Sequence, residues 1–240
     1  MPNETAISPP ENPRIFPSLE GIDYVLKLAG LHQELKPSWY LEIGVLSGSS
    51  LKVATANTIA VDPQFVLDPQ VYAGKKELHL FQTTSDAFFE SGRLAAITEK
   101  LDFAFLDGMH LFDFLLRDFI NTEKNCTKAA AIAMHDCIPI SEIAAERNWD
   151  RSKTQAWTGD VWKLVPILKK YRPDLSINVF DCPPSGLTVV SNLNPESTVL
   201  SDNYEQILTE FMGQSIASYG RDKLLNDLNI QNSRAPAASE

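Results

Sequence analysis

Glycines 44 and 48 lie in a stretch of sequence suited to binding a cofactor. It reads Tyr40-Leu-Glu-Ile-Gly-Val-Leu-Ser-Gly-Ser-Ser50, an apolar run followed by turn-forming residues. Glycine has no Cβ, so the backbone here can bend tightly and approach a ligand, although a turn that only packs has the same composition. The Gly-x-x-x-Gly spacing lacks the third glycine of a pyrophosphate-binding turn. Glu42 would repel a diphosphate and attract an ammonium or sulfonium group, so a cationic ligand is expected.

Two further polar positions follow the next apolar stretches. Asp62 closes Ile59-Ala-Val-Asp-Pro63, about 20 residues after the glycine turn, where a carboxylate can accept hydrogen bonds from a ribose diol. An aspartate at a strand end is as often structural, so this interpretation depends on Glu42 and the glycines. Ser85 and Asp86 follow the third stretch and could contact an adenine base. For Ser85 the role of helix N-cap is favoured.

Asp107, His110, His135 and Asp136 follow two later apolar stretches. The carboxyl ends of parallel strands share one crevice, so these side chains are expected to converge. A polar crevice of this kind can supply a general base, a metal ion, or both. His110 and His135 are the candidate bases, although His110 also fits a structural helix start. The candidate metal ligands are Asp107, His135 and Asp136; carboxylates suit magnesium, whereas an imidazole favours manganese, iron or zinc.

Strands and helices must position these residues. Short runs rich in β-branched and aromatic residues alternate with longer segments of helical periodicity, which predicts successive βαβ units and a parallel sheet. The predicted strands cover 39–45, 58–61, 78–83, 101–106, 129–134, 175–180 and 186–190. The predicted helices between them cover 49–56, 86–99, 111–125 and 160–171. The link at 181–185 is too short for a parallel crossover, so the last two strands are expected to form an antiparallel edge hairpin.

The two ends of the chain are expected to add helices and tails. Residues 18–35 predict a helix over the cofactor side of the sheet, with a buried face of Ile22, Val25, Leu26, Leu28 and Ala29. Residues 203–218 predict another, whose apolar face could join two copies of the chain through Tyr204, Ile207, Leu208, Phe211 and Met212. Residues 233–240 are too polar to order themselves. The expected divisions are an N-terminal tail and capping helix (1–36), a cofactor-binding domain (37–192), and a C-terminal helical segment with a disordered tail (193–240).

The composition of the chain limits the classes of molecule that it is expected to bind. The 240 residues suffice for one well-buried core, and 31 acidic against 21 basic side chains give a formal charge of -10. This charge repels phosphate backbones and anionic lipid headgroups, so neither nucleic acid nor membrane is expected as a partner. Residues 1–10 lack a secretory pattern and no apolar stretch approaches membrane-spanning length, so a cytoplasmic location is expected. The three cysteines lack Cys-x-x-Cys spacing and are expected to be reduced thiols.

In its motifs and their order, the chain resembles class I S-adenosylmethionine-dependent methyltransferases. Within that class it is most similar to a bacterial branch of small-molecule O-methyltransferases, including enzymes that methylate macrolide sugars. The resemblance covers about residues 37–190. The middle glycine often seen in the first motif is Leu46 here. The motifs are Glu42-Ile-Gly-Val-Leu-Ser-Gly-Ser49, Val61-Asp-Pro63, Phe105-Leu-Asp-Gly-Met-His110, His135-Asp136 and Thr158-Gly-Asp-Val-Trp-Lys163.

The resemblance implies a Rossmann-like, doubly wound, mostly parallel α/β sheet of seven strands. It implies transfer of a methyl group to a hydroxyl of a small molecule such as a sugar, a phenol or a natural product. His110 matches a proposed base, and Asp107 and Asp136 match the ligands of magnesium or manganese, with His135 where relatives have a second carboxylate. Contacts with S-adenosylmethionine are implied for Glu42, Gly44, Gly48, Ser49, Asp62, Ser85, Asp86 and Asp107.

Two other functions fit the sequence. A nicotinamide-dependent oxidoreductase would use a similar fold, but Glu42 and the wide glycine spacing disfavour it. A domain that binds the cofactor without turnover would keep the same motifs, and His135 in place of a carboxylate leaves that function open. The Trp157-Thr-Gly-Asp-Val-Trp162 segment would either close over substrate or pack its helix against the sheet.

Overall fold

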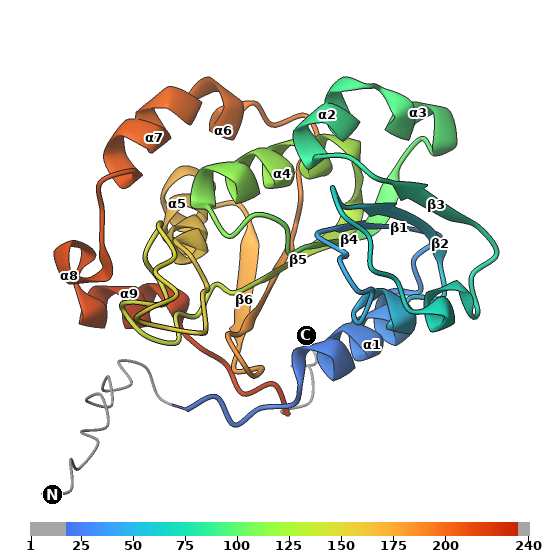
Figure 1. The fold of residues 1–240 in the computed structure, drawn as a ribbon. Helices are drawn as coiled ribbons and strands as arrows, with labels where there is room; N and C mark the ends of the chain where they lie inside the picture. Colours follow the sequence, from blue (N-terminus) through green and yellow to red (C-terminus); the bar gives the residue numbers. More distant parts are fainter. Residues whose placement is uncertain (1–17, 235–240) are drawn as a thin grey trace, which may run out of the picture.

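The computed structural model describes residues 18–234, so the predictions for residues 1–10 and 235–240 fall outside the described part. Within it, seven strands form one sheet in the order β3-β2-β1-β4-β5-β7-β6 (Figure 1). Neighbouring strands are parallel from β3 to β5, whereas β7 is antiparallel to both β5 and β6. The predicted sheet, including its antiparallel edge hairpin, is confirmed. The strands are β1 (Trp39–Ile43), β2 (Asn57–Val61), β3 (Leu78–Phe81), β4 (Leu101–Leu106), β5 (Cys126–His135), β6 (Ser176–Phe180) and β7 (Leu187–Ser191).

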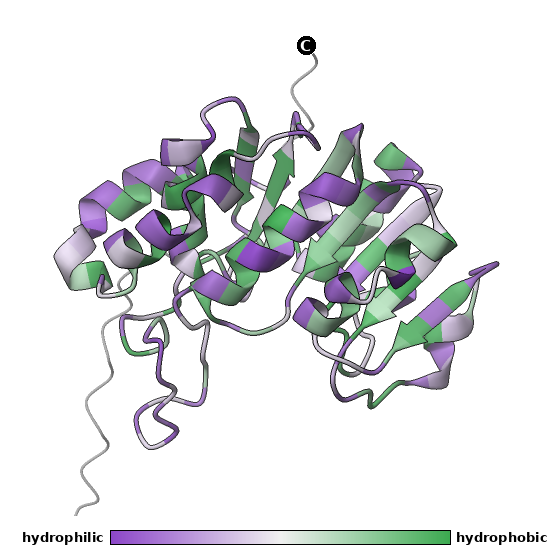
Figure 2. Ribbon diagram, turned by 90° about the horizontal axis from the view of Figure 1, so that it is seen from above, coloured by the Kyte–Doolittle hydropathy of each residue, from purple (hydrophilic) through white to green (hydrophobic). Residues whose placement is uncertain are grey.

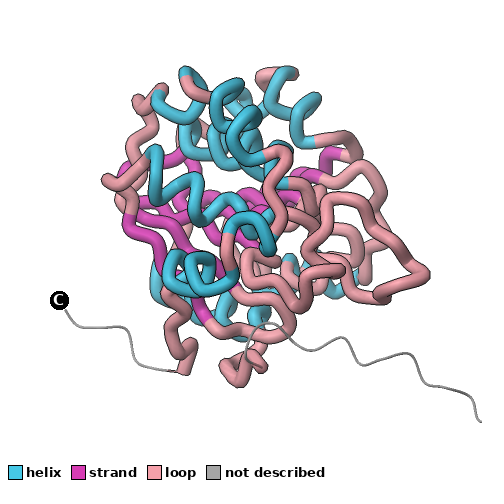
Figure 3. Tube along the Cα trace, turned by 90° about the vertical axis from the view of Figure 1, so that its left-hand side faces the viewer, coloured by secondary structure: helices cyan, strands magenta, loops and turns pink. Residues whose placement is uncertain are grey.

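Helices cover both faces of the sheet, and each face has its own apolar cluster (Figures 2 and 3). Alternate residues of a strand point to opposite faces. Leu41 and Ile43 therefore pack in the cluster that includes α4 (Phe112–Asn125) and α5 (Leu164–Tyr171). Tyr40 packs in the opposite cluster with Leu28 of α1 (Tyr24–Leu35).

Several predicted helices are shorter in the structure. Segment 49–56 contains only one 3-10 turn, η1 (Leu51–Val53), which ends where Ala54 takes an extended conformation. Segment 86–99 is divided at the left-handed Gly92 into α2 (Ser85–Glu90) and α3 (Arg93–Ile97). Segment 160–171 begins as the 3-10 turn η3 (Val161–Lys163) before α5. A further 3-10 turn, η2 (Pro69–Tyr72), lies between β2 and β3.

The N-terminal helix begins later than predicted. Asp23 accepts a hydrogen bond from the Val25 amide at 2.8 Å and is the N-cap of α1. The predicted buried face is wrong in part, because Leu26 is 63% exposed. Leu28 and His32 are the residues that this helix buries. Their spacing of four residues places them on one side of the helix.

The C-terminal segment folds back onto the core as four short helices. These are α6 (Val199–Asp202), α7 (Tyr204–Phe211), α8 (Ile216–Tyr219) and α9 (Arg221–Leu228). Ile207 and Phe211 are buried in the chain's own core, so the face predicted to join two copies is largely occupied within one chain. The predicted helix over 203–218 is interrupted at Met212 and Gly213, and glycine is a poor helix former.

The two ends of the described chain meet beside β6. Ser233 Oγ accepts a hydrogen bond from the Ile22 amide at 2.9 Å, and the Ser233 amide donates to Asp181 Oδ1 at 2.6 Å. The prediction that order is lost from residue 233 is therefore wrong for Ser233, which is buried. Its hydrogen bonds supply the stabilisation that apolar burial does not. Among residues 18–234, no helix has the length and apolar character needed to span a membrane.

Candidate active site

A cavity of about 540 Å³ opens at the carboxyl ends of β1, β2 and β4. Gly44, Asp62 and Asp107, which follow these three strands, all line it. Tyr24, the first residue of α1, also lines the cavity. The cavity is therefore built at the sheet edge where α/β folds bind ligands, and α1 contributes to it as the sequence predicted.

The two glycines of the turn have different surroundings. Gly44 has a φ of 86°, and a Cβ there would collide with the backbone carbonyl of Asp107. Its lack of a side chain thus lets the ends of β1 and β4 approach each other beside the cavity. Gly48 has a φ of 76°, but a Cβ there would meet the Val71 side chain, and Gly48 does not line the cavity. The structure thus gives Gly48 a packing role in the turn, whereas the sequence predicted cofactor contact.

Asp62 both lines the cavity and shapes its wall. Its Oδ2 accepts a hydrogen bond from the Leu46 amide at 2.8 Å, and its Oδ1 accepts one from the Gln64 amide at 2.7 Å. Leu46 has a φ of 41°, a left-handed conformation that is costly for a leucine. The hydrogen bond from Asp62 therefore stabilises the turn even though position 46 holds a leucine and not a glycine. Each carboxylate oxygen retains a second lone pair for a ligand.

Glu42 lies behind the cavity wall. It is fully buried and does not line the cavity. Its carboxylate accepts hydrogen bonds from the Tyr40 hydroxyl at 2.7 Å and the Ser50 hydroxyl at 2.6 Å. Burial raises the pKa of Glu42 to about 7, although these two hydrogen bonds oppose the shift. Ser50 does line the cavity, so Glu42 reaches the site through Ser50, a residue that the sequence did not single out.

Ser85 and Asp86 line the same cavity, as does Ser49. The N-cap of α2 is Thr84, whose hydroxyl accepts a hydrogen bond from the Ala87 amide at 3.3 Å, so the N-cap prediction for Ser85 is wrong. Asp86 accepts two hydrogen bonds from Arg117, both at 2.9 Å. Its negative charge is therefore already partnered within the chain.

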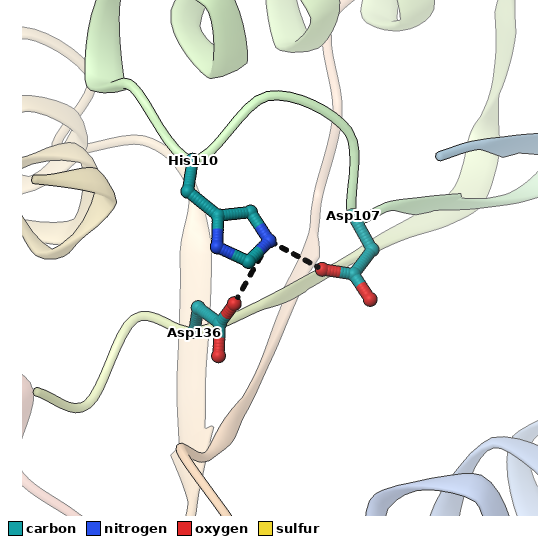
Figure 4. A group of neighbouring side chains, drawn as sticks. All are labelled: Asp107, His110 and Asp136. Carbon is teal, nitrogen blue, oxygen red and sulfur yellow. Dashed lines mark ion pairs between the residues drawn. The ribbon is translucent and has the colours of Figure 1, made fainter. Parts of the chain in front are cut away.

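Asp107, His110 and Asp136 converge, as predicted, on one point at the ends of β4 and β5 (Figure 4). The Nε2 atom of His110 lies 3.2 Å from Asp136 Oδ2 and 3.7 Å from Asp107 Oδ1. One ligand atom from each residue lies within 4.8 Å of the others, a grouping that could hold a metal ion. Asp136 adopts a φ of 61°, which aspartate tolerates better than most residues.

His135 lies behind this group and does not belong to it. Its Nδ1 is 3.4 Å from Asp107 Oδ1 and 3.3 Å from Asp136 Oδ1, and the side chain is buried outside the cavity lining. The Tyr24 ring packs on it with centroids 4.2 Å apart. The sequence placed His135 among the metal ligands and His110 beside them as a base. The geometry instead groups His110, and not His135, with Asp107 and Asp136.

The two histidines and two aspartates form one network of ion pairs. Burial alone lowers the pKa of each histidine, but the two aspartates outweigh it and raise the pKa of His110 to about 9 and of His135 to about 10. Burial alone raises the pKa of Asp107, but the two histidines lower it to about 2. The nearby carboxylates thus favour the protonated form of both histidines.

Tyr24 is a cavity residue that the sequence did not reveal. Burial, followed by the charges of Asp107 and nearby carboxylates, raises its pKa to about 12, so its hydroxyl remains a hydrogen-bond donor at neutral pH. Nothing in the local sequence marks it, because a tyrosine at a helix start is common. Its role becomes visible only when α1 is placed against the end of β5.

Comparison with solved structures identifies the fold. A presumed O-methyltransferase from Klebsiella pneumoniae has 14% identity and a TM-score of 0.52, with 71% of this chain and 80% of that chain covered. The cofactor-bound protein Rv0187 from MTB has 15% identity and a TM-score of 0.51, with 77% of this chain and 85% of that chain covered. No family model matches the sequence, and no curated protein matches it significantly. The chain thus has the Rossmann-like α/β fold of these structures.

Proposed function

We propose that this protein transfers the methyl group of S-adenosylmethionine to a hydroxyl of a small molecule, with a divalent cation held by Asp107, His110 and Asp136. One observation carries this proposal. A single cavity is lined by Asp62 after β2 and by Asp107 and His110 after β4. A nucleoside held at Asp62 would therefore share its cavity with a group of ligands suited to a cation.

The cavity suits S-adenosylmethionine in size and in polarity. Its volume of about 540 Å³ lies within the range of sites for ligands of this size. Asp62 offers carboxylate oxygens to a ribose, and the buried Glu42 provides negative charge behind Ser50 for the cationic methionine end. The shared fold with a presumed O-methyltransferase supports the same class of reaction.

The cluster of Asp107, His110 and Asp136 suits a divalent cation. Two carboxylates and one imidazole match magnesium or manganese, with open positions left for substrate and water. Nδ1 of His110 donates to the Trp157 carbonyl at 2.9 Å, an arrangement typical of histidines whose other nitrogen binds a metal. On binding, the cation would replace the proton on Nε2 of His110 and take its place between the two carboxylates.

In this scheme the bound cofactor supplies an electrophilic methyl group, and the cation lowers the pKa of the acceptor hydroxyl. The chain's residues mainly bind and orient. Asp62 and Ser50 fix the two ends of the cofactor, and His110 and the aspartates fix the position of the acceptor oxygen. His135 holds Asp107 and Asp136 in place from behind. The methyl group would pass from the sulfur to the acceptor oxygen, the hydroxyl proton would leave to water, and S-adenosylhomocysteine would be the second product.

The proposed function is tested by incubating the protein with radiolabelled S-adenosylmethionine, manganese and a panel of sugars, phenols and polyketide alcohols. Methyl transfer to at least one hydroxyl is expected. Tight binding of S-adenosylhomocysteine without transfer to any member would favour a binding domain. Hydride transfer with tight nicotinamide binding would contradict the proposal.

Asp62→Ala is expected to weaken S-adenosylhomocysteine binding by about 1 to 3 kcal/mol, because it removes a charged acceptor from the proposed ribose site. Calorimetry measures the effect. Asp68→Ala is the matched control, since Asp68 also accepts a hydrogen bond from the amide two residues on, at 2.8 Å, but lies outside the cavity lining. Equal affinities for the two variants would remove Asp62 from the site.

Glu42→Gln is expected to stabilise the free protein at alkaline pH while weakening cofactor binding. The raised pKa of Glu42, about 7 in place of 4.5, means that its contribution to stability is full below pH 4.5 and is lost as the pH rises through 7. Glutamine has no such loss. We expect the free energy of unfolding of the variant, relative to that of the unaltered chain, to be higher at about pH 8 than at about pH 5. Denaturant unfolding at the two pH values measures this difference. A pH-independent difference would contradict this account.

A further inference from the structure

The segment Trp157–Asp160, between β5 and α5, meets His110 at several points. Nδ1 of His110 donates to the Trp157 carbonyl at 2.9 Å, and the two rings stack with centroids 5.3 Å apart and an interplanar angle of 29°. The Asp160 amide donates to the His110 carbonyl at 3.2 Å. Gly159 lies against that same carbonyl, and a Cβ atom at position 159 would collide with it. Both the ring and the backbone of His110 are therefore fixed by one segment.

These contacts determine which nitrogen of His110 faces the carboxylates. A backbone carbonyl can only accept a hydrogen bond, so the nitrogen beside Trp157 must carry a proton. Nε2 is then the atom directed at Asp136 and Asp107, at 3.2 and 3.7 Å. Without the Trp157 carbonyl, the imidazole could rotate, and Nε2 would no longer be directed at the two carboxylates. The ring stack resists that rotation from the open side.

The segment is itself held firmly. The amides of Thr158 and Gly159 both donate to the Ala144 carbonyl, at 2.9 and 3.0 Å. The indole of Trp157 donates to the Glu146 carbonyl at 2.8 Å. Asp160 is buried, accepts a hydrogen bond from the Phe112 amide at 2.9 Å and pairs with Lys163 at 2.9 Å. The segment can therefore impose an orientation on His110.

The outer face of the stack offers a natural control. Trp149 lies parallel to Trp157, with centroids 5.6 Å apart and an interplanar angle of 1°. Among the described residues, its ring-stacking and cation–π contacts are with Trp157 and with Arg151, whose guanidinium lies over it at 4.3 Å. Removing Trp149 would disturb the loop and the stack without touching the imidazole. Loss of aromatic surface can thus be separated from loss of the contact with His110.

We propose that Trp157 is a positioning residue that holds His110 with a proton on Nδ1 and with Nε2 directed at Asp107 and Asp136. Its ring and its carbonyl act through His110 and contact no reacting atom. Gly159 and Asp160 fix the backbone on which this arrangement depends. The consequence for catalysis rests on the proposed function, but the orientation itself does not.

The primary test is nitrogen-15 NMR of the His110 imidazole in the metal-free protein. The expected result is an Nδ1 proton protected from exchange in the unaltered chain, in Trp157→Phe and in Trp149→Ala, and exposed in Trp157→Ala. The phenylalanine variant keeps an aromatic ring on the same backbone, so it should rescue the signal. An unprotected Nδ1 proton in the unaltered chain, or equal protection in Trp157→Ala, would overturn the proposal.

Calorimetric titration with manganese gives a second measurement. Trp157→Ala keeps the backbone carbonyl that accepts from Nδ1 but removes the stacked ring, so it is expected to bind manganese about 3- to 10-fold more weakly than the unaltered chain. Trp157→Phe and Trp149→Ala, which keep a ring against His110, should stay within about twofold of it. Equal manganese affinity in Trp157→Ala would overturn the positioning role. Failure of the unaltered chain to bind manganese would contradict the proposed metal site, whereas the Nδ1 signal would still decide the orientation.

Discussion

Removal of divalent cations with a chelator is expected to slow methyl transfer by at least about 100-fold while S-adenosylhomocysteine stays bound. The reason is spatial. The proposed cation ligands Asp107, His110 and Asp136 follow β4 and β5, whereas Asp62 and Ser50 belong to the turns after β2 and β1. In the chelated protein, the measured rate of methyl transfer should therefore fall while the calorimetric affinity for S-adenosylhomocysteine stays unchanged. Restoring manganese should restore the rate.

Asp136→Asn is expected to reproduce the effect of chelation, because an amide is a poorer ligand than a carboxylate. Asp102→Asn is the matched control. Asp102 accepts hydrogen bonds from the Ser38 and Trp39 amides at 2.9 and 3.1 Å, at the opposite end of β4 from Asp107. Undiminished transfer by Asp136→Asn in the presence of chelator would rule out the metal mechanism and return His110 to the role of an unaided base.

Gly44→Ala is expected to lower the free energy of unfolding by more than about 2 kcal/mol. Two penalties combine here. The φ of 86° is strained for any residue with a side chain, and the added Cβ would collide with the backbone carbonyl of Asp107. Neither can be relieved cheaply, because the Asp107 amide also donates to the Ile43 carbonyl at 2.8 Å. Denaturant unfolding measures the loss.

Gly30→Ala is the control for that substitution. Gly30 lies within α1, and a Cβ there would meet no atom within 4 Å. Alanine favours helix over glycine, so this variant should gain about 0.5 to 1 kcal/mol. If both alanine variants were equally stable, the close approach of β1 and β4 would not depend on Gly44.

The sheet could be predicted because its signal is local and repeated. Buried parallel strands read as apolar runs, and all seven appear within a few residues of their predicted positions. Helix lengths were less predictable. Nothing in the periodicity of 86–99 shows that Gly92 takes a left-handed conformation and divides the helix. The helix predicted over 49–56 is likewise reduced to the turn Leu51–Val53, because the chain becomes extended at Ala54.

The candidate site was predictable where topology alone brings residues together. Asp107, His110 and Asp136 converge because they follow adjacent strands. The order within the cluster was not predictable, since it depends on where Trp157 and Tyr24 pack. Those residues come from a long loop and from the N-terminal helix, and they place His110 forward and His135 behind. Tertiary packing of this kind has no signature in residue spacing.

The central claim is most directly tested by a crystal structure of the protein with S-adenosylhomocysteine and manganese. The account predicts the ribose at Asp62 and one manganese ion bound by Asp107, Asp136 and Nε2 of His110 in the same cavity. Cofactor density away from Asp62, or manganese bound elsewhere with this cluster closed by its own ion pairs, would contradict it.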